Sequence, residues 1–193
     1  GLCDTRLEYY RNNSRRIPSV AGDVVPEPVF TPAAYEAEIL ARAYRDIAPH
    51  DPEGILQQEW LNACGAIARF DRGAIEIRVL DIQECPAADL AALALIVSTL
   101  RAIAAERWQP LAAQQAWPVA PLHEILLRTI RAGEQAVIEN DAYRAALGCP
   151  AETRTAGGIW RYLRANVLPP AWETEFGSTL DRMLADGTLA RRI

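Results

Sequence analysis

The chain has 193 residues, about half of them apolar, and a formal net charge of −5. This length suits a single domain with a hydrophobic core, and the acidic balance argues against a nucleic-acid-binding protein that relies on phosphate contacts. The sequence contains no lysine, so every fixed side-chain cation is an arginine, which excludes a P-loop lysine and a Schiff-base lysine.

The positions of the cysteines and histidines argue against two further kinds of functional site. The 4 cysteines are far apart and form no metal-ligand spacing, and the only histidines, His50 and His123, are not at ligand spacing either. These patterns argue against a zinc site and a Ser–His–Asp triad. No signal peptide is visible, and the longest uninterrupted apolar run, Leu90 to Val97, is too short to span a bilayer. We expect a soluble, cytoplasmic protein that binds no nucleic acid and no membrane.

The first third of the chain predicts an irregular lead-in and two helices. Residues 1–31 are polar and interrupted by three prolines, which predicts turns rather than a long helix. An amphipathic helix is expected from Ala33 to Ala48, with Thr31 as its N-cap and Pro32 at its first position. A second helix is expected from about Pro52 to Ala63.

Residues 66–81 predict a β-hairpin, and its second strand carries two charges. Apolar residues alternate from Ile75 to Val79, the period of a strand with two unlike faces. Glu76 and Arg78 therefore point the same way, roughly 6.5–7 Å apart along the strand. The pair is either a surface ion pair or a carboxylate and a guanidinium that together hold a metal ion and a phosphate.

Two registers of this hairpin are possible. In the preferred one, a three-residue turn over Asp71–Gly73 supplies the positive φ at Gly73 and sets Ala68 opposite Glu76. A slip of one residue instead places Arg69 beside Glu76 on the same face. Both registers gather cations around one carboxylate.

The remainder, residues 87–193, predicts helices. A long helix from Ala87 to about Arg107 is apolar on nearly all sides between Leu90 and Val97, so we expect it to be buried. Further helices are expected over residues 120–147, 155–166 and 171–185, with glycines just after the first and the last of them.

The hairpin and the helix after it resemble the glutamate–cysteine ligase type 2 family, the carboxylate–amine ligases of the glutamine-synthetase-like group. The resemblance covers most of the chain, and its specific signal lies between Trp60 and Leu100. The family motif is a glycine-led strand with alternating glutamate and arginine that ends in aspartate, followed by an Ala/Leu-rich helix. Here it consists of Gly73, Ile75, Glu76, Ile77, Arg78 and Asp81, followed by Asp89 to Ala94.

The resemblance implies an α+β fold: the predominantly helical C-terminal portion of a glutamine-synthetase-like fold, whose β-hairpin contributes to an antiparallel sheet. It also implies an ATP-dependent ligase that uses Mg²⁺ and joins a glutamate-like carboxylate to an amine through an acyl phosphate. By motif position Glu76 is a Mg²⁺ ligand and Arg78 is the catalytic residue that contacts the transferring phosphate. Arg69 and Arg72 are nucleotide-phosphate contacts.

One carboxylate cannot hold Mg²⁺ and ATP by itself, so the resemblance further implies an incomplete site. We expect residues 1–193 to form one domain, the C-terminal part of a larger ligase, inactive without the missing N-terminal half. Two alternatives stay open: a non-catalytic helical interaction domain in which Glu76 and Arg78 form a structural pair, and an ATP-dependent phosphotransfer enzyme acting on guanidino or carboxylate compounds. The amine acceptor is not indicated, and a homo-oligomer is left open.

Overall fold

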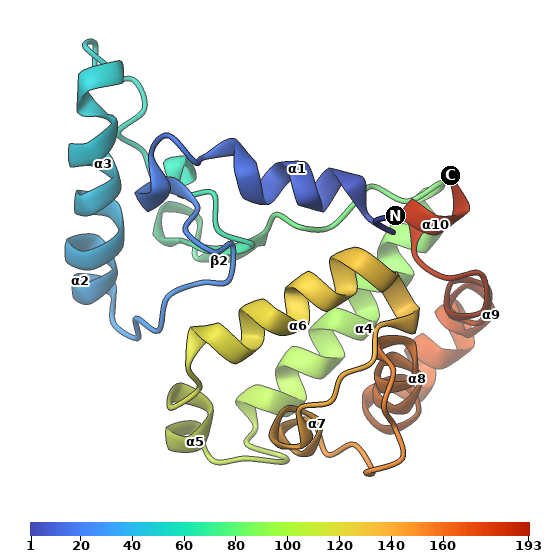
Figure 1. Ribbon diagram of the computed structural model, residues 1–193. Coiled ribbons are helices and arrows are strands. Elements are labelled where there is room, and N and C mark those ends of the chain that lie inside the picture. The colour runs from blue at the N-terminus through green and yellow to red at the C-terminus, as the bar shows by residue number, and fades with distance from the viewer. The chain divides into compact units, whose positions relative to one another are not determined.

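The computed structural model describes every residue from Gly1 to Ile193 (Figure 1). Helices predominate and the only sheet is a two-stranded antiparallel one, which confirms the α+β class. The chain divides into two compact units. One comprises Arg6–Leu80 with Pro118–Leu126, and is called the hairpin unit below. The other comprises Gly1–Thr5, Asp81–Trp117 and Leu127–Ile193, and is called the helical unit.

The hairpin unit begins with a helix where an irregular lead-in is predicted. Helix α1 spans Thr5–Asn13, and a single 3₁₀ turn follows at Pro18–Val20. The Arg11 guanidinium pairs with Glu8 one turn earlier, at 2.6 Å, and the Asn12 side chain donates to the Glu8 carbonyl. The three prolines of the lead-in all lie after this helix, so they limit its length without preventing it.

The helix predicted over residues 33–48 is present but not regular. It comprises α2 (Pro32–Ala34), a π-helical turn (Tyr35–Leu40), α3 (Ala41–Ile47) and a final 3₁₀ turn (Ala48–His50). Thr31 caps it as predicted, because its hydroxyl accepts a hydrogen bond from the Ala34 amide at 3.2 Å. Nothing in the sequence pattern predicts the π-helical turn. Such π-turns are rare inside helices and often mark functional sites.

The helix predicted from Pro52 to Ala63 is absent. This segment forms turns, with only the 3₁₀ turn Glu59–Leu61. Gly54 adopts a φ of +67°, which a helix does not allow. The Asp51 carboxylate accepts hydrogen bonds from the Ile55 and Leu56 amides, at 3.0 and 2.8 Å, so it stabilises a turn and does not cap a helix.

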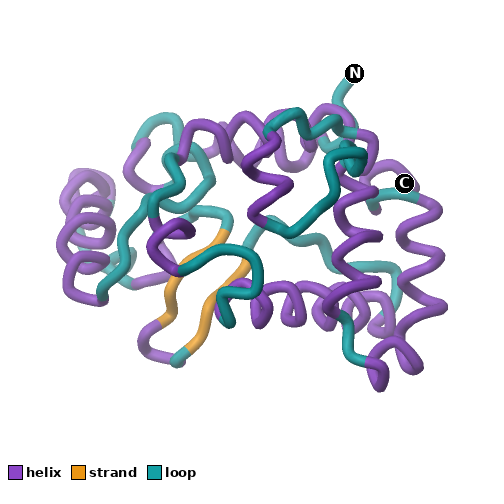
Figure 2. Tube along the Cα trace, turned by 90° about the horizontal axis from the view of Figure 1, so that it is seen from below, coloured by secondary structure: helices purple, strands orange, loops and turns teal.

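The predicted hairpin is confirmed, and Figure 2 shows its two strands side by side. Its register is the slipped one. Strand β1 spans Ala66–Arg69 and β2 spans Ala74–Ile77, with Ile67 opposite Glu76. The preferred pairing of Ala68 with Glu76 is wrong by one residue because Phe70 leaves the strand. Its ring packs edge-on against Tyr35, with ring centroids 5.5 Å apart, and its carbonyl closes a 3₁₀ turn. Gly73 has the expected positive φ, +58°.

The helical unit holds most of the remaining helices. The helix predicted over residues 120–147 is broken, because Gly133 adopts a φ of +57° and Asn140 caps a new helix through its side chain. The elements are α4 (Pro86–Ala104), α5 (Leu111–Gln115), α6 (Val119–Ala132), a 3₁₀ turn (Gly133–Gln135), α7 (Asp141–Ala146), α8 (Ala156–Val167), α9 (Pro170–Asp186) and α10 (Leu189–Arg192). The first residues of α6 belong to the hairpin unit.

Helix α4 packs against α8 and α9 through one face only (Figure 1). Ala91 and Leu95 are buried against Leu180 of α9. Leu90 and Leu93 on another face are each 51% exposed, so the prediction of burial on nearly all sides is wrong. By length and composition alone the 19-residue helix could cross a membrane, although core helices of soluble proteins pass the same test. It is longer than the apolar run that the sequence suggests.

Candidate functional site

The charged residues of the hairpin lie on its inner face. Arg69, Glu76 and Arg78 share a face with Ile67, as the register requires. Ile67 is 2% exposed and Arg69 is 7% exposed, whereas Ile75 on the opposite face is 71% exposed. The alternation predicted from the sequence is therefore present, with the charges turned toward the interior of the hairpin unit and an isoleucine turned toward solvent.

Arg69 is the central residue of this face, because three carboxylates contact its guanidinium. It binds Asp71 through two nitrogens, at 3.2 and 3.1 Å, and Glu76 through a third, at 2.8 Å. Glu59, from the 3₁₀ turn before β1, lies 3.4 Å from its Nε. The hydrogen bonds to Asp71 and Glu76 raise the pKa of Arg69, and the reciprocal bond lowers the pKa of Asp71.

Glu76 lies between two guanidinium groups. Its Oε2 accepts from Arg69 at 2.8 Å, and its Oε1 is 3.0 Å from the Nε of Arg78. The Arg69 hydrogen bond, with the positive charge of Arg78, lowers the pKa of the Glu76 carboxyl. The carboxylate is consequently held ionised, and both of its oxygens have a cationic partner.

The Arg78 side chain is partly buried. It is 21% exposed and lies close to Tyr10 of α1, where burial raises the pKa of the tyrosine and the Arg78 charge opposes that shift. The Tyr10 hydroxyl donates to the carbonyl of Ala63 at 3.0 Å, which ties α1 to the segment that leads into β1. Helix α1 thus helps to position the Arg78 guanidinium.

Arg72 is separate from this cluster. It lies in the 3₁₀ turn between the strands, its side chain is 67% exposed, and its nearest ionic contact is Asp71 at 3.5 Å. Of the four predicted site residues, the structure therefore brings together Arg69, Glu76 and Arg78 on one face and leaves Arg72 at the tip of the hairpin.

Three residues that contact or support the hairpin were not predicted as site residues from the sequence. Glu59 and Tyr10 are two of them, and nothing in their local patterns distinguishes them from ordinary surface residues. The third is Tyr35, at the start of the π-helical turn, whose hydroxyl accepts from the Asn62 side chain at 2.8 Å and from the Ala68 amide at 3.3 Å. Asn62, 3% exposed, thereby acts as a buried support for β1.

The carboxylates near Arg69 do not form a metal site in this arrangement. No group of three or more histidine, cysteine, aspartate or glutamate side chains is placed to hold a metal ion. Glu76 can supply a single carboxylate, and it does so only by giving up an ion pair with Arg69 or Arg78. Residues 1–193 alone therefore do not fit a complete Mg²⁺ site.

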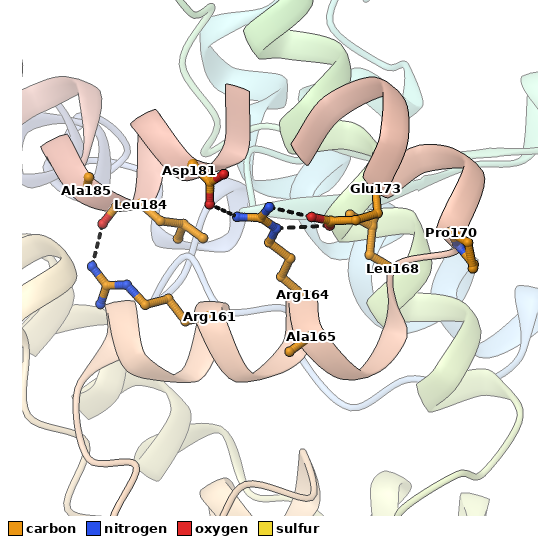
Figure 3. Close-up of a pocket in the computed structure, with 9 residues that line it drawn as sticks. All are labelled: Arg161, Arg164, Ala165, Leu168, Pro170, Glu173, Asp181, Leu184 and Ala185. Atoms are coloured by element: carbon orange, nitrogen blue, oxygen red, sulfur yellow. Dashed lines mark hydrogen bonds and ion pairs between the residues drawn. The ribbon is translucent and has the colours of Figure 1, made fainter. Parts of the chain in front are cut away.

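A second polar site lies in the helical unit, between α8 and α9 (Figure 3). A cleft of about 600 Å³ is lined by Arg161 and Arg164 of α8 and by Glu173 and Asp181 of α9. Arg164 binds Glu173 through two nitrogens and Asp181 through a third, and Arg161 donates to the Leu184 carbonyl. These contacts occupy the cations, so the cleft is an interhelical ion-pair network.

Comparison with known proteins yields one informative relative. An uncharacterized protein from Archaeoglobus fulgidus is 39% identical over 99 residues, which cover 51% of this chain and 27% of the archaeal protein. The chain thus corresponds to only about a quarter of that relative. No protein-family model matches the sequence, and no solved structure matches it.

Proposed function

We propose that this chain contributes part of the active site of an ATP-dependent carboxylate–amine ligase of the glutamate–cysteine type, with a glutamine-synthetase-like fold. One observation carries the proposal: one face of the hairpin presents Glu76 between the guanidinium groups of Arg69 and Arg78. At the positions of Glu76 and Arg78 the family motif has a carboxylate and a phosphate-binding arginine. Arginine suits this task because its planar fork matches phosphate oxygens bidentately.

The proposed roles follow from the geometry of the pairs. Arg78 binds the transferring phosphate or the substrate carboxylate, and it reaches that anion by releasing Glu76 Oε1. Arg69 is already shared among three carboxylates, so it acts by holding Glu76 in place. Arg72, exposed at the hairpin tip, is a further phosphate contact. Mg²⁺, where bound, would neutralise the phosphate oxygens and take Glu76 as one ligand.

The remaining ligands for the ion must come from outside residues 1–193, because this chain offers one carboxylate at the motif position. The match covers only 27% of the archaeal relative, and a larger protein of that kind could supply them. We propose that this other part forms the N-terminal half of the ligase, that the substrates are a glutamate-like carboxylate and an amine, and that the protein acts in the cytoplasm.

The test is the Glu76→Gln variant of the full-length polypeptide that contains these residues. The amide keeps the size of the side chain and removes its charge, so Mg²⁺-dependent ADP formation from ATP with glutamate and a panel of amines should fall by about 10²-fold or more. The variant should still fold, at a melting temperature lowered by the loss of the ion pairs with Arg69 and Arg78. Glu139→Gln is the matched control, since Glu139 is 68% exposed and pairs only with Arg128. Wild-type turnover by the Glu76 variant would refute the assignment.

A second experiment tests the half-site interpretation separately. We expect residues 1–193 by themselves to produce no ADP above background under the same conditions. Robust turnover by this chain alone would show that the site is complete without further protein.

A structural role is the competing function, and one observation favours it. Arg69 and Arg78 already have carboxylate partners, so neither guanidinium needs a ligand to neutralise its charge. In that case the chain is a non-catalytic helical interaction domain. Loss of folding in the Glu76→Gln variant, with no effect of nucleotide on the wild type, would support this alternative.

A further inference from the structure

The two oxygens of Glu76 are held unequally. Oε2 accepts a hydrogen bond from Arg69 at 2.8 Å. Oε1 lies 3.0 Å from the Nε of Arg78, but no protein group accepts a hydrogen bond from that buried nitrogen. The contact with Arg78 is therefore an attraction between charges without hydrogen-bond geometry. Its loss would break no hydrogen bond, and Glu76 would stay bound to Arg69.

Arg78 is held in place by groups other than Glu76. Its amide donates to the Gly65 carbonyl at 2.8 Å, which fixes the backbone at this position. Its guanidinium lies close to the Tyr10 side chain, whose hydroxyl donates to the Ala63 carbonyl at 3.0 Å. An exchange of the carboxylate for another anion at Arg78 therefore requires motion of the Glu76 side chain only.

Positive charge is more available at Arg78 than at Arg69. Arg69 is buried and shares its charge among three carboxylates, whereas Arg78 is partly exposed and pairs with Glu76. The exposed Arg6 adds to this charge, because it donates to the backbone carbonyl of the residue after Arg78 at 3.1 Å and its charge acts on the same Tyr10 hydroxyl. An anion at Arg78 is thus attracted by two guanidinium groups and opposed most directly by the Glu76 carboxylate.

We propose that Glu76 is a built-in competitor for the anion-binding position at Arg78, so that this position takes a phosphate group and rejects a simple carboxylate. The inference rests on the ligase proposal and decides between the two anions named there. Because Glu76 is tethered beside Arg78, a free carboxylate of equal charge competes with a group at high effective concentration. A phosphate group carries close to two negative charges at neutral pH and has more acceptor oxygens, so it displaces the side chain.

Removal of the competing charge should strengthen phosphate binding. Glu76→Gln keeps the size of the side chain and an oxygen that can accept from Arg69. We expect this variant of the 193-residue chain to bind inorganic phosphate about tenfold or more tightly than the wild type, because a like charge beside the anion is gone. Isothermal titration calorimetry measures the two affinities.

Two further variants show whether the gain is local. Glu59→Gln removes the same charge from the same cluster, but the Glu59 carboxylate pairs with Arg69. Its effect on phosphate affinity should be less than about threefold, because its charge lies against the other arginine. In the double variant Glu76→Gln/Arg78→Gln the gain should disappear.

A measurement on the wild-type chain does not depend on how well the variants fold. Heteronuclear NMR resolves the Nε–Hε signals of individual arginines. Added inorganic phosphate should shift the Arg78 signal and leave the Arg69 signal nearly unchanged, since Arg69 keeps its three carboxylates. Acetate at the same concentration should shift neither signal, because it carries no more charge than the Glu76 side chain that it must displace.

The inference is wrong if Glu76→Gln binds phosphate no more tightly than the wild type, or if Glu59→Gln gains as much. It is also wrong if acetate shifts the Arg78 signal as far as phosphate does. The ligase proposal fails by a different readout, wild-type turnover of Glu76→Gln in the full-length polypeptide. We expect the variant to lose turnover there and to gain phosphate affinity in the 193-residue chain, so the two failures are distinguishable.

Discussion

Replacement of Asn62 by alanine should destabilise the hairpin unit, because this buried amide connects three segments. Asn62 is 3% exposed; its Nδ2 donates to the Tyr35 hydroxyl at 2.8 Å, and its Oδ1 accepts from the Cys64 amide at 3.0 Å. Alanine removes both bonds, leaves the Cys64 N–H without a partner and weakens the hydroxyl that accepts from Ala68. A buried polar group left unpaired costs about 1–3 kcal/mol, so we expect a loss of about 2–4 kcal/mol.

Urea unfolding followed by circular dichroism measures this loss, and amide hydrogen exchange at Cys64 and Ala68 locates it. Asn166→Ala is the matched control, because the exposed Asn166 side chain makes one hydrogen bond to a carbonyl of its own helix and should change stability by less than about 0.5 kcal/mol. If the Asn62 variant unfolds within that same margin of the wild type, the buried network does not support β1.

Three further predictions concern the core, a turn and the charged face. Leu95→Ala should cost about 2–5 kcal/mol of unfolding free energy, measured by urea titration, because it leaves a cavity between α4 and α9. Gly148→Ala should cost more than about 1 kcal/mol in the same assay, since a Cβ there meets the Trp108 indole nitrogen at 2.3 Å and the φ is +68°. The Arg69 hydrogen bond lowers the pKa of Glu76 in the folded state, so its stabilisation should be complete above about pH 4.3, the ordinary value, and lost as pH falls through the folded pKa.

Each of these has a clear contrary result. A Leu95 variant as stable as the wild type would mean that α4 and α9 do not share a core, and a stable Gly148 variant would mean that the turn relaxes freely. For the charged face, an NMR titration should give a Glu76 pKa below that of an unstructured peptide. An ordinary value would mean that Arg69 does not hold the carboxylate in solution.

Local chemistry made some elements predictable from the sequence. Thr31 and Pro32 mark the start of a helix because the hydroxyl caps an amide and the proline lacks one, and both assignments are confirmed. Gly73 was expected in a left-handed conformation because a tight hairpin turn requires it. The charge spacing also placed Glu76 and Arg78 on one face, as the strand period demands.

Other features depended on contacts that a sequence pattern does not record. Phe70 shifts the hairpin register because its ring packs on Tyr35, a residue 35 positions earlier in the chain. Asp51 reads equally well as a helix cap and as a turn residue, and only the positive φ of Gly54 decides between them. Gly133 interrupts a helix that the apolar periodicity continues.

The candidate site, too, was only partly predictable from the sequence. The carboxylate and guanidinium at Glu76 and Arg78 were identified from their spacing, yet which face of the strand turns inward was not. That choice follows from Arg69, which Asp71, Glu76 and Glu59 satisfy so fully that it is buried. The three carboxylates converge on Arg69 because of the hairpin register and the 3₁₀ turn that carries Glu59, and the sequence alone does not determine either of these.

The most direct measurement is a crystal structure of the full-length polypeptide grown with Mg²⁺ and a non-hydrolysable ATP analogue. The ligase proposal predicts a phosphate oxygen within ion-pair distance of the Arg78 guanidinium, with Glu76 Oε1 released from that arginine. An unchanged Arg69–Glu76–Arg78 network, covered by apolar side chains from the rest of the protein, would contradict it.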